Sequence, residues 1–171
     1  MALTRNIRDI LVPLAEYPHL RDRASLRDAF TVLRQGFASG KRFRHVLVLN
    51  DKDQLVGLLG IRDILRGMFP EYLRTKEHAH HEAPIPDFPA LTLIWAQTCE
   101  TQCPVAADKK ITDFMASVPG KVDAGDPITK AAYLLVVHET SMLPVVDGKR
   151  LVGVVRMVDV FNEAAKVVLN D

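Results

Sequence analysis

The sequence predicts an α/β fold made of two copies of one small unit. Residues 55–63 read LVGLLGIRD and residues 151–159 read LVGVVRMVD, so both runs are apolar, contain a glycine and end in an aspartate. A short apolar run bounded by polar turns is typical of a buried strand. The aspartate then falls where a helix begins. The duplication therefore predicts two related strand-to-helix units, each with a small sheet.

Composition limits the classes of protein that fit. The chain has 171 residues, of which 48% are hydrophobic and 25% charged, and its formal net charge is +1. This length allows one core or two small halves that share one. The balanced charge provides no field that would attract nucleic acid or an anionic membrane. Apolar runs are too short to span a bilayer and residues 1–6 carry no apolar signal core, so we expect a soluble cytoplasmic protein.

The first repeat is expected over residues 5–69. After a short helical turn near residues 7–11, Ser25 and Asp28 form a capping-box pattern before an amphipathic helix. The apolar face of this helix is formed by Leu26, Ala29, Phe30 and Leu33. Two strands follow, at 44–50 and 55–59, with a polar turn between them. A helix over 62–68 then completes the unit.

The second repeat is expected over residues 109–170 in the same order. Residues 111–115 echo residues 7–11, and Asp126 and Pro127 predict an N-cap followed by proline at the first helical position. The apolar face of that helix is formed by Ile128, Ala131, Ala132 and Leu135. Strands at 141–147 and 151–155 and a helix over 158–168 complete the copy.

Residues 70–108 have no counterpart in either repeat. The prolines at 84, 86 and 89 predict an extended passage, followed by a helix from about Ala90 to Gln102 that Pro104 ends. We therefore expect an inserted helical linker between the repeats.

The order of these motifs resembles the CBS domain, the family named after cystathionine β-synthase. The resemblance rests on residues 143–147, 151–155 and Asp159 in the second repeat, and on 46–50 and 57–63 in the first. A tandem pair of such domains forms a Bateman module. The resemblance implies a pseudo-twofold axis, clefts between the paired sheets, and a homodimer shaped as a flat disc of four domains. It also implies adenosyl ligands such as AMP, ADP, ATP or S-adenosylmethionine.

In this family the aspartate at the start of the last helix holds the ribose hydroxyls, which assigns that role to Asp63 and Asp159. A carboxylate can accept hydrogen bonds from both vicinal hydroxyls. The family usually has Thr or Ser three residues earlier, whereas this chain has Gly60 and Arg156. Glycine has no side-chain donor, while arginine can pair with a phosphate or fill the cleft.

The resemblance also implies that each cleft combines the aspartate of one repeat with the strand start of the other. Asp159 would then share a cleft with Arg44 and His45, which together with Arg156 suit a phosphorylated nucleotide. Asp63 would share the second cleft with Ser141 and Met142. This second cleft has less positive charge and suits a nucleoside or no ligand.

Simpler interpretations exist for the same residues. Asp63 and Asp159 could act only as first-turn carboxylates that interact with the helix dipole. The basic run at residues 41–45 could be ordinary solvated surface. Cys99 and Cys103 could bind zinc together with the upstream Glu and His residues, or could be small packing residues on a helix. The potential upstream ligands are Glu77, His78, His80, His81 and Glu82.

No spacing in the sequence indicates a nucleophile with its base, a phosphate-binding glycine loop or a catalytic carboxylate pair. We therefore predict a non-enzymatic regulatory module that binds an adenine nucleotide, needs no cofactor and acts on a partner protein that the sequence does not identify. A structural dimerisation module with degenerate sites is the first alternative, favoured by Gly60 and Arg156. A metal- or redox-responsive module built on the insert is the second.

Overall fold

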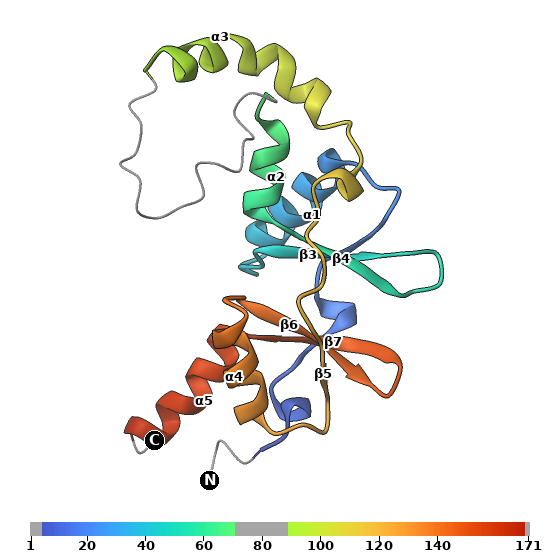
Figure 1. Cartoon of the computed structure of the whole chain (residues 1–171), viewed down its shortest axis with the longest axis vertical. Helices are drawn as coiled ribbons and strands as arrows, with labels where there is room; N and C mark the ends of the chain where they lie inside the picture. The colour runs from blue at the N-terminus through green and yellow to red at the C-terminus, as the bar shows by residue number, and fades with distance from the viewer. Residues whose placement is uncertain (1–4, 71–88, 170–171) are drawn as a thin grey trace.

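Two similar α/β units are stacked along the long axis of the molecule (Figure 1). The structure is a computed structural model that describes residues 5–70 and 89–169. The upper unit contains β2 (His19–Arg21), α1 (Leu26–Ala38), β3 (His45–Leu49), β4 (Leu55–Gly60) and α2 (Ile61–Met68). The lower unit contains β1 (Val12–Pro13), β5 (Val122–Asp123), α4 (Ile128–Val137), β6 (Met142–Asp147), β7 (Arg150–Arg156) and α5 (Met157–Leu169). The β3–β4 and β6–β7 hairpins point to one side of the molecule, and α2 and α5 lie on the other.

The two sheets share one topology. The strand order is β2-β3-β4 in the upper sheet and β5-β6-β7-β1 in the lower one. In both, the first strand pairs in parallel with the second and the hairpin strands pair antiparallel. The strands predicted at 44–50 and 141–147 are confirmed, and their apolar side chains are buried on both faces. The capping box of Ser25 and Asp28 is confirmed as well.

The first residues of each repeat cross over to the other unit. Val12 in β1 pairs with Val154 in the lower sheet, and Ala116 forms a bridge with Leu58 in the upper one. Ile7 and Ile111 sit in the short 3₁₀ turns Ile7–Asp9 and Ile111–Asp113. Ile7 is fully buried in the lower core and Ile111 in the upper core.

The exchange extends to the starts of the two helices. The Ile128 N–H donates to the Arg5 carbonyl at 3.0 Å, and the Leu26 N–H donates to the Lys109 carbonyl at 2.9 Å. Each packed unit thus contains residues of both sequence repeats. The units cannot separate unless both sheets lose a strand or bridge and both cores lose a buried isoleucine.

Glycine permits the crossing segments to lie against the sheets. A Cβ atom added to Gly153 would clash with the Val12 carbonyl oxygen and come within 2.9 Å of Leu11 Cδ1. A Cβ at Gly57 would collide with the Met115 side chain in the equivalent place. The glycine in each repeated motif is therefore required by close approach of the exchanged segment.

Two helix ends differ from the sequence prediction. Asp126 is one residue too early to be the N-cap of α4, because Pro127 occupies that position. The Asp126 carboxylate instead accepts from the Asp123 N–H at 2.8 Å and from Lys130 Nζ at 2.7 Å.

The inserted helix α3 spans Pro89–Ala106 and continues past Pro104, which was expected to end it. The hydrogen bond that Pro104 cannot make would reach the carbonyl of Glu100, an exposed residue whose carbonyl water can reach. Within residues 5–70 and 89–169, none of the helices combines the length and apolar character needed to cross a membrane.

The tight approach at Gly153 gives a direct test of the exchanged packing. We expect Gly153→Ala to lower the free energy of unfolding by about 1–3 kcal/mol, the usual cost of overpacking. Urea denaturation followed by circular dichroism would measure this change. Gly120→Ala is the matched control, because a Cβ at Gly120 meets nothing within 4 Å. Equal stability of the two variants would contradict the packing of β1 on β7.

Candidate functional site

A cleft opens between the two units where β3 and β6 begin. Its volume is about 660 Å³, which lies in the range of small-molecule sites. The first repeat contributes Tyr17, Arg42, Phe43, Arg44 and His45. The second repeat contributes Ser141, Met142, Arg156, Met157, Val158 and Phe161. Both strand starts therefore face one hollow, whereas the sequence analysis assigned them to two separate clefts.

The floor of the cleft is apolar and aromatic. The rings of Tyr17 and Phe43 are tilted at 58° with centroids 4.7 Å apart, and both side chains are buried. The Tyr17 hydroxyl donates to the sulfur of buried Met142 at 3.4 Å, which joins the two repeats across the floor. Burial raises the pKa of Tyr17 to about 12, so the phenol stays neutral. Such a floor suits a flat, largely apolar group such as a heterocyclic base.

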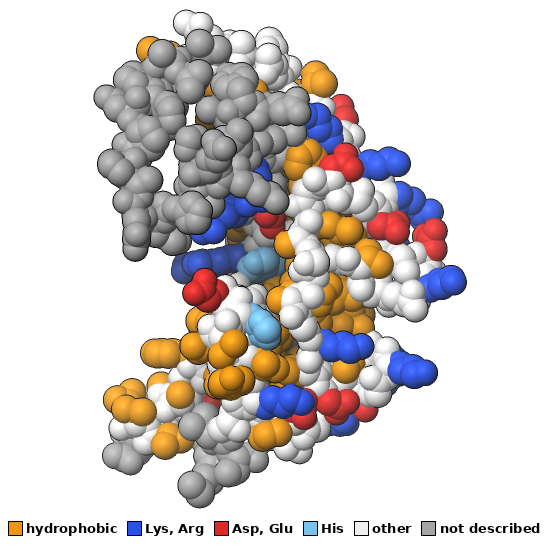
Figure 2. Space-filling view, viewed as in Figure 1, with side chains coloured by type: hydrophobic (Ala, Val, Ile, Leu, Met, Phe, Trp, Pro, Cys, Tyr) orange, Lys and Arg blue, Asp and Glu red, His pale blue; other side chains and the backbone are white. Residues whose placement is uncertain are grey.

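Arginines line the side of the cleft that belongs to the first repeat. Arg42 and Arg44 are exposed, and no carboxylate in the described part of the chain forms an ion pair with either of them. Figure 2 shows Lys and Arg side chains gathered at the waist of the molecule, above the hydrophobic side chains of the lower unit. The cleft thus has an apolar floor and a basic edge, an arrangement that fits a ligand with a ring at one end and an anion at the other.

Arg156 and Asp159 form a bidentate ion pair at the junction of β7 and α5. Arg156 Nε lies 2.7 Å from Asp159 Oδ2 and Arg156 Nη2 lies 2.6 Å from Asp159 Oδ1. The Asp159 side chain is only 16% exposed, and pairing with it raises the pKa of Arg156. Both carboxylate oxygens are therefore engaged, and Arg156 rather than Asp159 faces the cleft.

The first repeat has Gly60 at the position that Arg156 occupies in the second repeat. Gly60 lies against the His45 ring, because a Cβ at Gly60 would be 3.2 Å from His45 Cδ2 and 3.2 Å from Asp63 Oδ2. Burial lowers the pKa of His45, although the charge of Asp63 acts in the opposite direction. A side chain at Gly60 would thus be crowded by the imidazole, and His45 lines the cleft whereas Asp63 does not.

Asp63 and Asp159 both occupy the third position of their helices. The Gly60 N–H donates to Asp63 Oδ2 at 2.9 Å, and Arg66 Nη1 lies 3.4 Å from Asp63 Oδ1. The Arg156 N–H likewise points at Asp159 Oδ2 at 3.3 Å. Each aspartate therefore accepts from the N–H that precedes its own helix, and neither lines the cleft between the units.

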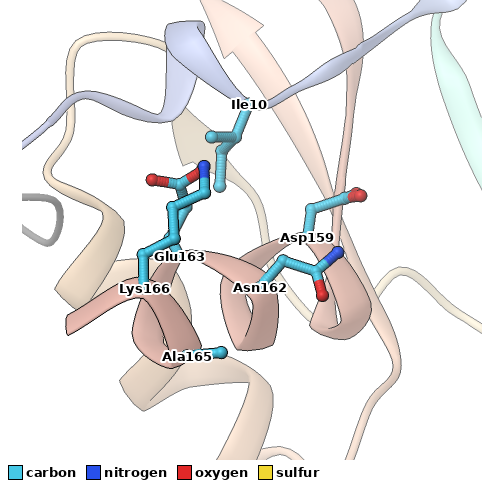
Figure 3. Close-up of a pocket in the computed structure, with 6 residues that line it drawn as sticks. All are labelled: Ile10, Asp159, Asn162, Glu163, Ala165 and Lys166. Atoms are coloured by element: carbon cyan, nitrogen blue, oxygen red, sulfur yellow. The ribbon is translucent and has the colours of Figure 1, made fainter. Parts of the chain in front are cut away.

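A second hollow of about 550 Å³ lies along the other side of α5 (Figure 3). There the Glu163 and Lys166 side chains lie together beside Ile10, while Asp159 points away from them. Lys166 Nζ is 2.6 Å from Glu163 Oε1 and Arg5 Nη1 is 3.3 Å from Glu163 Oε2. The hydrogen bond from Lys166 holds the pKa of buried Glu163 below its ordinary value. We interpret this hollow as a structural contact that fixes α5 to the exchanged N-terminal segment.

The structure describes only some of the residues that the sequence suggested as zinc ligands in the insert. Cys99 and Cys103 are free thiols on one side of α3, and burial together with Cys99 raises the pKa of Cys103 to about 11. Across residues 5–70 and 89–169, no three His, Cys, Asp or Glu side chains gather in a way that could hold a metal ion. Glu77, His78, His80, His81 and Glu82 lie outside the described residues, so their proposed role is not tested.

Several cleft residues were not identified as site residues from the sequence. They are Tyr17, Arg42, Phe43, Met157, Val158 and Phe161. Tyr17 lies in the segment that follows the exchanged turn, and nothing local marks that segment as part of a site. Phe161 could have been noticed from the sequence as an exposed apolar residue of α5. Adjacent residues of a helix lie on different faces, so Phe161 cannot share the face of its neighbour Val160, which is buried.

Comparisons with known proteins agree with this architecture. The CBS domain family profile matches residues 7–69 and 111–166. The crystal structure of CBSX2 in complex with AMP is 21% identical with a TM-score of 0.63, covering 95% of this chain and 98% of that one. The CBS domain of a CBS-domain-containing membrane protein from Sphaerobacter thermophilus is 20% identical with a TM-score of 0.67, covering 94% and 89%.

A third solved structure is the cytosolic domain of the Mg²⁺ channel MgtE in complex with ATP. It is 20% identical with a TM-score of 0.58, and the match covers 90% of this chain but 46% of that one. No curated protein sequence is significantly similar to this chain. At these identities the solved structures establish the fold.

The half-buried position of His45 predicts a pH dependence of stability. The folded state disfavours the charged imidazole, so below pH 6.5 the unfolded chain binds more protons and stability falls as the pH drops. Urea unfolding at pH 7.5 and pH 5.5 should therefore show a smaller loss of stability for His45→Asn than for the wild type. His138→Asn, a change at an exposed histidine, should keep the wild-type loss. An identical loss in all three proteins would contradict the lowered pKa of half-buried His45.

Proposed function

This chain belongs to the CBS-domain family, with two copies of the domain in tandem, and on that premise we propose that it is a non-enzymatic regulatory module that binds an adenine nucleotide between its repeats. The observation that carries the proposal is the 660 Å³ cleft with an apolar floor and a basic edge. The presence of AMP and ATP in the solved structures of CBSX2 and MgtE supports the class of ligand.

We assign the adenine to the floor formed by Tyr17, Phe43 and Met142. Burying one face of a purine against these side chains, which are themselves already buried, removes chiefly the purine's own apolar surface from water. The phosphates are then assigned to Arg42 and Arg44, which have no counter-ion among the described residues. Binding an anion there satisfies two exposed guanidinium groups and breaks no ion pair with a carboxylate of residues 5–70 or 89–169.

The ion pair between Arg156 and Asp159 affects how a ribose could bind in the cleft. Arg156 bonds to both oxygens of Asp159, so a ribose diol has to compete with a charge-assisted bidentate pair. A nucleoside has no anionic group that could replace Asp159 as the partner of Arg156, whereas a polyphosphate has one. The cleft should therefore prefer ADP or ATP over adenosine. Asp63, which lies behind His45 and pairs with Arg66, is assigned a structural role in this proposal.

A structural dimerisation module remains the second candidate. The specific observation that favours it is that both ribose-binding positions are occupied from within the chain, by Arg156 in one repeat and by His45 beside Gly60 in the other. Homodimer formation and a protein effector, both expected from the resemblance, belong to either candidate.

Thermal unfolding with added ligands separates the two candidates. Ligand at 100 times its dissociation constant stabilises the folded state by about 2.7 kcal/mol, which raises the melting temperature by about 5–10 °C for a chain of this size. We expect such a shift with ADP or ATP and a smaller one with AMP, S-adenosylmethionine or adenosine. Arg44→Gln should weaken ADP binding by about tenfold, the value of one charge-assisted hydrogen bond. Arg34→Gln, an exposed arginine of α1 outside the cleft, is the matched control. Flat melting curves with every ligand would favour the structural module.

Replacing Arg156 by the residue type usual in the family tests the selection by phosphate. We expect Arg156→Thr to bind adenosine more tightly than the wild type, because Asp159 becomes free for the ribose, while ATP binding weakens. Isothermal titration calorimetry with adenosine and ATP on both proteins gives the ratio of the two affinities. If Arg156→Thr weakens both ligands equally, the ion pair serves only to position α5.

A further inference from the structure

A further hollow adjoins the cleft where α1 ends and α2 begins, and we call it the α1–α2 hollow. Its volume is about 450 Å³, and it is lined by Phe37, Gly40, Arg42, Arg44 and Ile61. Arg42 and Arg44 also line the cleft between the units. The cleft and the α1–α2 hollow therefore share two arginines, and a ligand held by these guanidinium groups can extend into both.

The segment that joins α1 to β3 is longer than its counterpart in the second repeat. Nineteen positions separate Leu26, the first residue of α1, from His45, the first residue of β3. Only fourteen positions separate Ile128 of α4 from Met142 of β6, and no arginine lies between them. Four of the five residues that line the α1–α2 hollow belong to the longer segment. The hollow is thus built mainly by a part of the chain in which the two repeats differ.

Hydrogen bonds hold this segment against the ends of α1 and α2. The Lys41 N–H donates to the Gly36 carbonyl at 2.9 Å, and the Ile61 N–H donates to the Arg44 carbonyl at 3.0 Å. Phe43 is only 8% exposed, whereas the arginine on each side of it is exposed. Burial of the Phe43 ring therefore anchors the segment, and it leaves both guanidinium groups accessible to an anion.

The lining of the α1–α2 hollow suits a ring that follows this anion. The Phe37 side chain is 47% exposed there, and Ile61 adds a second apolar side chain. Among the described residues, no acidic side chain lines the hollow. A Cβ added at Gly40 would meet nothing within 4 Å, so that side is open. A flat apolar group bound against Phe37 would remove exposed aromatic surface from water.

The two hollows together describe a ligand with a ring at each end and an anionic bridge between them. A mononucleotide with its base on the floor of the cleft and its phosphates at Arg42 and Arg44 leaves Phe37 exposed. A dinucleotide with a pyrophosphate bridge provides one phosphate for each arginine and a second ring for Phe37. This second ring should be neutral, because a cationic ring would be repelled by the two guanidinium groups.

We propose that the α1–α2 hollow is a second ring-binding subsite, through which the chain prefers a pyrophosphate-bridged dinucleotide over a mononucleotide. The proposal rests on the proposed function, since the cleft must first bind an adenine nucleotide. The specificity comes from the α1–β3 segment of the first repeat and from Phe37 in particular.

NADH and ADP-ribose are the probes that test the subsite on the full chain. They share the adenosine, the pyrophosphate and the second ribose, and NADH adds the neutral dihydronicotinamide ring. By isothermal titration calorimetry we expect NADH to bind about tenfold more tightly than ADP-ribose, which is close to the value of one well-packed aromatic contact. Equal affinities would overturn the proposal.

Replacing Phe37 tests which residue receives the second ring. We expect Phe37→Ser to abolish the advantage of NADH and to leave ADP-ribose binding unchanged, because Phe37 does not line the cleft. Phe30→Ser is the matched control, since Phe30 is an exposed phenylalanine of the same helix that lines neither hollow. It should keep the tenfold advantage. Retention of the advantage in Phe37→Ser, or its loss in Phe30→Ser, would contradict the assignment. If Phe37→Ser does not fold, the comparison of the two probes on the wild type decides alone.

ATP distinguishes a failure of the subsite from a failure of the proposed function. If ATP binds but NADH has no advantage over ADP-ribose, the subsite is wrong and the nucleotide cleft stands. If ATP, ADP-ribose and NADH all fail to bind, both proposals are wrong.

Discussion

The exchange of the first segment between repeats is the constraint on which the rest of the structure depends. Ile7 completes the core of the lower unit and Ile111 that of the upper unit, so neither repeat has a complete core of its own. Each half of such a chain, at about 60 residues, would have only marginal stability alone. The exchange also fixes the two sheets so that β3 and β6 begin at the same place. The cleft therefore follows from the way the core is shared, and the close contacts at Gly57 and Gly153 keep the exchanged segments against their sheets.

The two halves have diverged within this common frame. The position usually held by a small hydroxyl residue is a glycine packed on His45 in one repeat and an arginine paired with Asp159 in the other. The exposed positions of α4 and α5 are largely apolar, whereas those of α1 and α2 combine polar residues with Phe30, Phe37 and Leu65. The end of α3 lies beside α1, where Arg27 pairs with Asp108.

The sequence was sufficient for the fold but only partly for the site. Periodicity, caps and the repeated motif located β3, β4, β6, β7 and the helices that follow them, because each of these signals is local. The exchange of residues 5–13 and 109–116 leaves no local signal, since Ile7 and Ile111 would look the same whichever core they filled. For the same reason Tyr17 was missed. Arg156 was recognised as a departure from the family, but its bidentate pair with Asp159 could not be read from the sequence, because arginine three residues before an aspartate does not fix where the side chain points.

The cleft is selective, in this account, because an apolar floor and exposed arginines border one hollow that the shared core holds together. The most direct measurement is a crystal structure of the chain grown with ATP. We expect the purine on Tyr17 and Met142, the phosphates at Arg42 and Arg44, and Arg156 turned away from at least one oxygen of Asp159. A nucleotide bound elsewhere on the molecule, or an empty cleft at saturating ATP with the Arg156–Asp159 pair intact, would contradict the account.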